Sequence, residues 1–217
     1  MNVLKKIYCR AYQFVFKIML PFLPYREPKI LNDMDELAKT LLEKNIKKVM
    51  LITDKQIRSF NLTSSLEESL KTNNIDCLVY DGTNPNPTID NVVEAKTLYL
   101  ENNCECLIGF GGGSSIDCAK AVGALIAYPK KTIENLKGTL KVRRRLPLLF
   151  AIPTTAGTGS ETPVTAVITD AKTHHKYTLN NFTMIPRYAI LDPKLTYSLP
   201  RSLTSTTGMD ALTHAVE

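Results

Sequence analysis

Residues 106–117 read Cys-Leu-Ile-Gly-Phe-Gly-Gly-Gly-Ser-Ser-Ile-Asp, a short apolar run that passes directly into three glycines. The apolar run is typical of a buried strand, and the residues after the glycines are typical of a helix. Glycines let a ligand come close to the backbone, and the free N–H groups of a helix N-terminus, here with Ser114 and Ser115, donate hydrogen bonds to phosphate. The stretch therefore predicts a strand, a phosphate-binding turn and a helix.

This turn differs from two common phosphate-binding motifs. No Gly-Lys-Ser/Thr follows it, as a P-loop requires, and its glycines do not have the Gly-x-Gly-x-x-Gly spacing of the usual dinucleotide turn. The acidic residue expected about 20 positions downstream is also missing. On this motif alone, a glycine-rich turn that binds no phosphate is the alternative.

Along the rest of the chain, short apolar runs alternate with segments of helical periodicity. We expect strands at 48–53, 76–80, 106–110, 148–152 and 188–191, helices at 33–45, 64–74 and 88–102, and a hairpin joining 166–169 to 176–179. This alternation predicts an α/β fold with a parallel sheet. The pattern is helical from Pro200 onward, so we place a boundary near Leu199. The expected parts are an N-terminal helix and linker (1–29), an α/β domain (30–199) and the start of a helical domain (200–217).

Bulk composition excludes several classes of function. The 217 residues carry a net charge of +6, but the basic clusters are not interleaved with aromatic residues, so we expect no nucleic-acid binding. Five cysteines, an odd number, do not indicate a disulfide framework and favour a reducing, cytoplasmic location.

The first segment, Val3 to Leu23, is apolar but is interrupted by polar residues at 5, 6, 10, 13 and 17. That pattern is amphipathic, and it fits neither a signal peptide nor a membrane span. We expect a surface helix, ended by Pro21, Pro24 and Pro28, that packs on its own domain or on a partner subunit. Contact with a membrane surface is the alternative.

Two further elements could meet a nucleotide. Asp54 closes the strand at 48–53, where its carboxylate could accept hydrogen bonds from both ribose hydroxyls and repel a 2′-phosphate, which would favour NAD over NADP. A helix N-cap or turn aspartate is the alternative reading of Asp54. The loop Pro153-Thr-Thr-Ala-Gly-Thr-Gly-Ser-Glu161 follows another strand, and its hydroxyls and N–H groups can wrap phosphates and the nicotinamide ribose.

Asp210 and His214 lie four positions apart in a helical segment, so both side chains can reach one cation. Two protein ligands rarely hold a catalytic metal, and the only other histidines, His174 and His175, are adjacent to each other beside lysines. A simple contact on one helix face is the alternative.

Three stretches together resemble the iron-dependent (group III) alcohol dehydrogenase family. They are Gly-Gly-Gly-Ser-x-x-Asp at 111–117, the loop at 153–161, and Gly-Met-Asp-Ala-Leu-Thr-His-Ala-Val-Glu at 208–217; the loop at 81–88 and the segment from 167 to 176 are also similar. The resemblance covers about Ile30 to Glu217. It implies a Rossmann-like parallel-sheet NAD-binding domain followed by the first helix of an otherwise absent all-α metal-binding domain. The family's N-terminal edge strand is here replaced or preceded by the basic amphipathic helix.

The resemblance also implies roles for single residues. Asp54 and Asn86 would contact the adenosine half of NAD, and Gly112, Gly113 and Ser114 would cradle its pyrophosphate. The rest of the nucleotide cleft would be lined by Thr154, Thr155, Thr158, Val167 and Lys176. Asp210 and His214 match the first two ligands of a divalent metal, Fe(II) or Zn.

The implied activity is hydride transfer between a primary or secondary alcohol and NAD, in a homodimeric parent enzyme that acts on a small alcohol or aldehyde. We expect this chain to be an N-terminal fragment with weak or no turnover, because further histidine ligands of the family are missing. The exposed apolar face of 206–217 would be mobile or packed against another copy. The alternatives are a glycerol-dehydrogenase-like or dehydroquinate-synthase-like enzyme, and a stand-alone nucleotide-binding module.

Overall fold

A six-stranded parallel sheet lies at the centre of the computed structural model, which describes residues 3–19, 25–197 and 199–216. The strand order is β1-β9-β6-β4-β2-β3. The strands are β1 Lys29–Leu31, β2 Lys48–Ile52, β3 Asp76–Tyr80, β4 Cys106–Gly111, β6 Leu148–Pro153 and β9 Tyr188–Ile190. The predicted α/β fold is confirmed.

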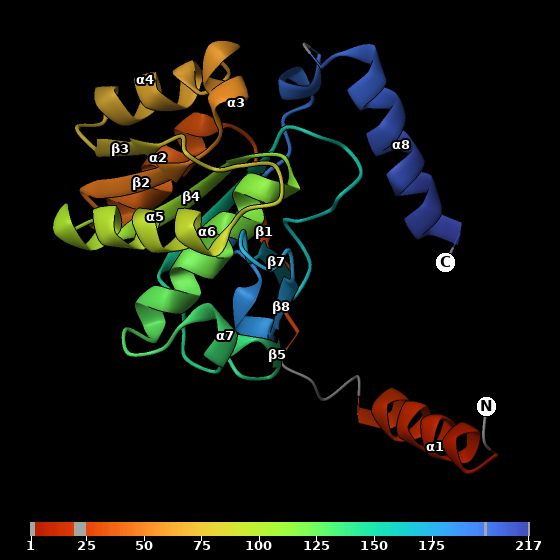
Figure 1. Ribbon diagram of the computed structural model, residues 1–217. Helices are drawn as coiled ribbons and strands as arrows, with labels where there is room; N and C mark the ends of the chain where they lie inside the picture. Colours follow the sequence, from red (N-terminus) through yellow and green to blue (C-terminus); the bar gives the residue numbers. More distant parts are fainter. Residues whose placement is uncertain (1–2, 20–24, 198, 217) are drawn as a thin grey trace.

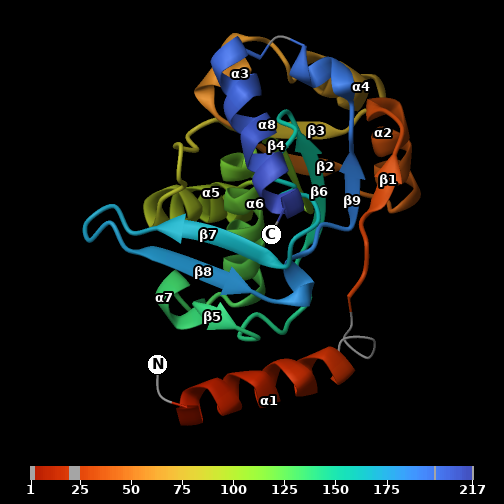
Figure 2. The same ribbon diagram turned by 90° about the vertical axis from the view of Figure 1, so that its right-hand side faces the viewer.

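Helices cover both faces of this sheet (Figures 1 and 2). Along β2, Met50 and Ile52 pack into the core on one face, while Val49 and Leu51 pack into the core on the other. The first face carries α5 (Ile89–Glu101) and α6 (Gly113–Ala127); the second carries α2 (Met34–Glu43), α3 (Lys55–Ser59) and α4 (Ser64–Thr72). Burial on both faces explains why the strands are continuous apolar runs.

A small second sheet, in the order β5-β8-β7, lies beside the first layer of helices. Its strands are β5 Gly138–Thr139, β7 Thr165–Thr169 and β8 Lys176–Asn180, and β7 and β8 pair antiparallel as the predicted hairpin. Shorter elements are α7 (Ile133–Leu136) and the 3-10 turns η2 (Phe182–Met184) and η3 (Pro193–Thr196).

Helix starts follow local capping chemistry. Asp33 precedes α2 and its side chain accepts a hydrogen bond from the Glu36 N–H. Thr88 begins α5 in a capping box with Asn91, as the sequence predicted for Thr88. The sequence analysis did not anticipate α3, α7 or β5, all of which are too short for a clear periodicity. From the sequence, the N-terminal edge strand could be either replaced or preceded by the amphipathic helix. The strand β1 is present, and the helix precedes it.

That preceding helix, α1 (Val3–Met19), lies apart from the body (Figures 1 and 2). Its apolar side chains include Ile7, Tyr8 and Phe14, which are 60%, 72% and 66% exposed. Its own domain therefore does not cover these side chains, and the other expected surface, a partner subunit, stays a prediction. Pro21 and Pro24 lie outside the described residues. Among those described, no helix is long and apolar enough to cross a membrane.

The hairpin is held to α6 by a completely buried lysine. The Lys120 ammonium donates to the carbonyl oxygens of Pro163 and Thr165, at 2.9 and 3.0 Å, and Asp117 accepts from the Val167 N–H at 3.0 Å. Burial lowers the pKa of Lys120 to about 8, partly offset by the nearby Asp117 carboxylate. Burial also raises the pKa of Asp117 to about 6.

We predict that Lys120→Met lowers the free energy of unfolding by about 2 kcal/mol or more, because each buried carbonyl left without a donor costs about 1–3 kcal/mol. Urea unfolding at pH 7, followed by circular dichroism, measures the change. Lys96→Met is the matched control: Lys96 is partly exposed and its Nζ lies 3.5 Å from the Pro129 oxygen. A loss no larger than that of the control would contradict the role of Lys120.

The same substitution should alter the dependence of stability on pH. Since the folded pKa of Lys120, about 8, lies below its ordinary 10.5, the unfolded chain holds the extra proton between these values. The contribution of Lys120 to the free energy of unfolding is therefore fully present above pH 10.5 and is lost as the pH falls through about 8. The rise in stability between these pH values should be smaller in Lys120→Met than in the unsubstituted chain.

Candidate active site

The carboxyl ends of β2, β4 and β6 lie side by side at one edge of the central sheet. From β2 the chain crosses to β3 through α4 on one face, whereas from β4 it crosses toward β6 through α6 on the other. Such a reversal opens a crevice outside the carboxyl ends of the strands, where α/β folds bind ligands. Asp54 follows β2 and Gly112 follows β4, on either side of this crevice.

A cavity of about 560 Å³ occupies the crevice. It brings together most of the predicted cofactor residues, namely Asp54, Gly112, Gly113, Ser114, Thr154, Thr155 and Thr158. The sequence analysis did not single out several other lining residues: Phe60, Leu62, Leu199, Leu203 and Thr207. The i, i+4 spacing of Leu203 and Thr207 could have indicated a shared helix face, whereas the residues next to the short α3 gave no signal.

Two glycines of the turn have different roles. Gly111 has a φ of +142°, and a Cβ there would lie 2.7 Å from the Ser115 Oγ, so the fold itself requires glycine. A Cβ on Gly112 would make only ordinary contact, 3.8 Å from Thr155, so the space above Gly112 is open. No side chain caps α6 at Gly112, which leaves its first N–H groups available to a ligand.

Asp54 is an N-cap and a cavity residue at once. One oxygen accepts from the Ile57 N–H at 2.9 Å, which caps α3, and the other lies 3.4 Å from the Ser115 Oγ. The alternative reading of Asp54 as an N-cap is thus correct. It does not remove the carboxylate from the cavity, because the second oxygen faces the turn before α6.

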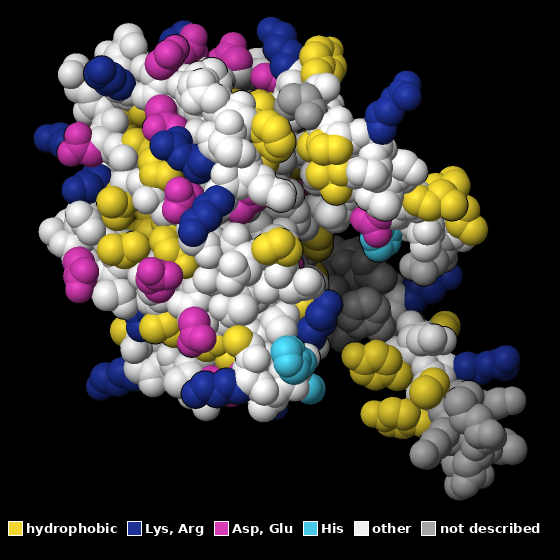
Figure 3. Space-filling model, turned by 45° about the horizontal axis from the view of Figure 1, so that its top comes forward, with side chains coloured by type: hydrophobic (Ala, Val, Ile, Leu, Met, Phe, Trp, Pro, Cys, Tyr) yellow, Lys and Arg dark blue, Asp and Glu magenta, His cyan; other side chains and the backbone are white. Residues whose placement is uncertain are grey.

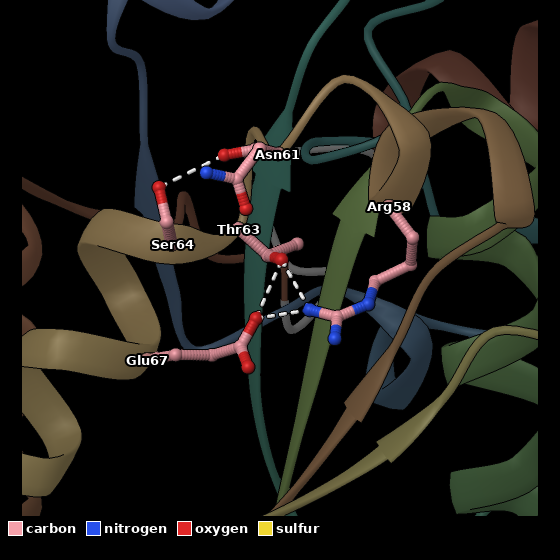
Figure 4. A network of polar contacts seen from close by, with 5 residues as sticks. All are labelled: Arg58, Asn61, Thr63, Ser64 and Glu67. Carbon is pink, nitrogen blue, oxygen red and sulfur yellow. Dashed lines mark hydrogen bonds and ion pairs between the residues drawn. The ribbon is translucent and has the colours of Figure 1, made fainter.

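The short helix that Asp54 caps is fixed by a polar network (Figure 4). Arg58 in α3 forms an ion pair with Glu67 in α4, and the Thr63 hydroxyl lies between them, 2.7 Å from the Arg58 Nη1 and 2.6 Å from the Glu67 Oε1. A five-residue helix is not stable alone, so this network helps to set the position of Asp54.

The loop after β6 presents hydroxyl groups that have no hydrogen-bond partner. The Oγ1 atoms of Thr154, Thr155 and Thr158 are buried and unpaired among the described residues. Buried polar groups are nearly always paired, because leaving one unpaired costs about 1–3 kcal/mol. All three line the same cavity, so a ligand rich in hydrogen-bonding oxygens would satisfy them.

Two other predicted residues, Asn86 and Lys176, lie beside the cavity without lining it. The Asn86 N–H donates to the Ser114 Oγ at 3.3 Å, and the Lys176 ammonium donates to the Asn86 Oδ1 at 3.2 Å. This chain of contacts extends from the glycine turn to the hairpin. Val167 also lies outside the lining, and its N–H is already bound to Asp117.

Asp210 and His214 lie on α8 (Arg201–Val216), which runs along one side of the body (Figure 1). The His214 Nε2 and Asp210 Oδ1 are 3.7 Å apart and both side chains are exposed, so they meet on one helix face, and their role as metal ligands stays a prediction. Among the described residues, no third His, Cys, Asp or Glu joins them in a group that could hold a metal. Two donors alone do not make a catalytic metal site.

α8 nevertheless contacts the cavity. Leu203 and Thr207 contribute to its lining, and Gly157, with a φ of +156°, lies so close to the Thr207 carbonyl that a Cβ would collide with it. The apolar side chains of Met209 and Leu212, further along α8, are 63% and 56% exposed. Figure 3 shows groups of hydrophobic side chains on the parts that project from the body.

Comparisons with known proteins agree with this geometry. The sequence model of the family described as iron-containing alcohol dehydrogenase matches residues 28–193. Alcohol dehydrogenase 4 of Schizosaccharomyces pombe is 39% identical over 84% of this chain and 43% of its own length. The NAD-dependent methanol dehydrogenase of Bacillus methanolicus is 36% identical over 84% of this chain and 48% of its own length.

Solved structures give the same result. An alcohol dehydrogenase from Oenococcus oeni matches with a TM-score of 0.84 and 34% identity, covering 90% of this chain and 52% of that one. Sulfoacetaldehyde reductase from Bifidobacterium kashiwanohense, in complex with NAD+, matches with a TM-score of 0.77 and 28% identity, covering the same shares. This chain spans about half the length of the relatives it matches. It belongs to the iron-containing alcohol dehydrogenase family.

Proposed function

We propose that this chain is the dinucleotide-binding part of an NAD-dependent dehydrogenase that acts on a small primary or secondary alcohol. Residues 30–199 would form the NAD-binding domain, and residues 200–217 would begin a metal-binding domain. The observation that carries the proposal is that Thr154, Thr155 and Thr158, whose hydroxyls are buried and unpaired among the described residues, line the same cavity as the open glycine turn. The presence of NAD-dependent enzymes and an NAD+ complex among the relatives supports the choice of cofactor.

The residues present fit a dinucleotide. The α6 N-terminus and the space above Gly112 suit the pyrophosphate, because N–H groups and the helix dipole favour negative charge. Asp54 would accept hydrogen bonds from the ribose hydroxyls with the oxygen that does not cap α3. The threonine hydroxyls would orient the nicotinamide half, and a bound nicotinamide supplies the hydride acceptor.

The donor set for a metal is incomplete in the described residues. Asp210 and His214 could share an ion, but an alcohol-activating site takes further protein ligands. These two donors would lie on a helix that borders the cavity, because Leu203 and Thr207 on the same helix line it.

Asp54→Ser should narrow the preference for NAD over NADP about tenfold, since it removes the charge that repels a 2′-phosphate while serine can still cap α3. Fluorescence titrations with NADH and NADPH give the ratio of the two dissociation constants. Asp33→Ser is the matched control, because Asp33 caps α2 in the same way, accepting from the Glu36 N–H at 2.8 Å, outside the cavity. An unchanged ratio in Asp54→Ser would reject the ribose role.

Gly112→Ala should weaken NADH binding about tenfold and change the free energy of unfolding by no more than about 1 kcal/mol. The added methyl fits the free fold but fills the space that the pyrophosphate would occupy. Calorimetric titration and urea unfolding measure the two effects. Gly208→Ala on α8, where a Cβ would have no neighbour within 4 Å, should leave binding unchanged. Equal binding by both variants would show that the dinucleotide does not use this turn.

With NAD and ethanol, the 217-residue chain should show little or no turnover when Fe(II) or Zn(II) is added, while it still binds NADH. The reason is the two-donor set, which should hold a metal only weakly. Formation of NADH measured at 340 nm, together with the metal content after desalting, tests this. Full turnover with about one retained metal per chain would contradict it.

A further inference from the structure

A second cavity, of about 640 Å³, lies at the opposite edge of the central sheet. Its lining includes Leu148 and Leu149 at the start of β6, and Arg187 immediately before β9. These are amino ends of strands, whereas the glycine turn lies at the carboxyl ends. The two cavities share no lining residue, so the second one is separate from the candidate NAD site.

Arginines surround this second cavity: Arg26, Arg143, Arg145 and Arg187. No carboxylate in the described part of the chain forms an ion pair with any of them. The half-buried Arg26 donates through Nη2 to the Ile185 oxygen at 2.7 Å, but its Nη1 is buried and has no partner among the described residues. Burial, followed by the neighbouring charges of Arg187 and Arg145, lowers the pKa of Arg26.

This arrangement is unfavourable without an anion. The like charges repel, although water screens the exposed Arg143, Arg145 and Arg187, and the buried Arg26 N–H without an acceptor adds a desolvation cost. A phosphate group would offset both the repulsion and the desolvation cost, because it carries up to two negative charges and several acceptor oxygens that match guanidinium geometry. A single carboxylate offers less charge to several arginines.

The remaining walls indicate the body of the ligand. Leu146, Pro147, Phe182 and Ile185 give the cavity apolar surface next to the guanidinium groups. We propose that this cavity binds a phosphate monoester, with the phosphate among the arginines and an apolar organic group against Leu146, Phe182 and Ile185. The site does not depend on the proposed dehydrogenase function.

Methyl NMR on the 217-residue chain can test the site and locate it. Phenyl phosphate is the probe, and the Ile185 and Ile57 methyl groups report on the arginine cavity and the glycine-turn cavity respectively. We expect saturable shifts at Ile185 and tighter binding of phenyl phosphate than of inorganic phosphate. Shifts confined to Ile57, no saturable shift, or equal affinity for the two probes would overturn the proposal.

Arg26→Met and Arg145→Met should each weaken phenyl phosphate binding about tenfold. Arg145 is the safer test of the pair, because its side chain is exposed and donates no hydrogen bond in the described part of the chain. The matched control is Arg144→Met, which removes the same charge from the same segment, but its guanidinium donates to the Ala127 oxygen and does not line the cavity. An equal loss in the control, or no loss in Arg145→Met when thermal unfolding confirms the fold, would refute the site.

Discussion

The buried ammonium of Lys120 connects the parts of the molecule that form the nucleotide cleft. Lys120 lies on α6, the helix that follows the glycine turn. Its ammonium donates to carbonyls on the segment that leads from the threonine loop into β7. Asp117, one turn earlier, binds the backbone of β7. A charge buried this deeply is tolerated only with good acceptors, so the two carbonyls and the lysine fix each other's position. The glycine turn and the threonine loop are thereby held at the distance that defines the cavity.

Much of this fold could be predicted from sequence because its main signals are local. Strands buried on both faces must be apolar along their buried length, and β2 after Lys48, β4 and β6 are. Thr88 could be assigned as an N-cap from its own neighbourhood. The five-residue α3 could not be predicted in this way, because it depends on contacts among Arg58, Thr63 and Glu67 that span two helices. α1 could be predicted as a helix but its packing could not, because amphipathicity indicates an apolar face but not the surface that covers it.

Some features of the site could likewise be predicted from local sequence, and others could not. The turn at Gly111 to Ser114 is a local motif, and its position at a strand end was evident from sequence. The link from Lys176 to Asn86 joins residues 90 positions apart, and only the resemblance to a known family indicated it. Asp54 is a third case, since the cap and the ligand reading were treated as alternatives. A carboxylate has two oxygens: one caps α3, and the other accepts from the Ser115 hydroxyl, so the cap does not exclude a ligand at Asp54.

The two ends of α6 explain why the two cavities differ in chemistry. At the glycine turn, the helix N-terminus carries partial positive charge, so an anion can be bound by backbone N–H groups without any basic side chain. At the other end the carbonyls carry partial negative charge, and Arg144 neutralises this by donating to Ala127. Capping of this kind also accounts for one nitrogen of Arg26, whose Nη2 donates to the Ile185 oxygen at the end of η2. It does not account for the Arg26 Nη1, which is buried and has no partner among the described residues, and the proposed anion would supply the missing acceptor.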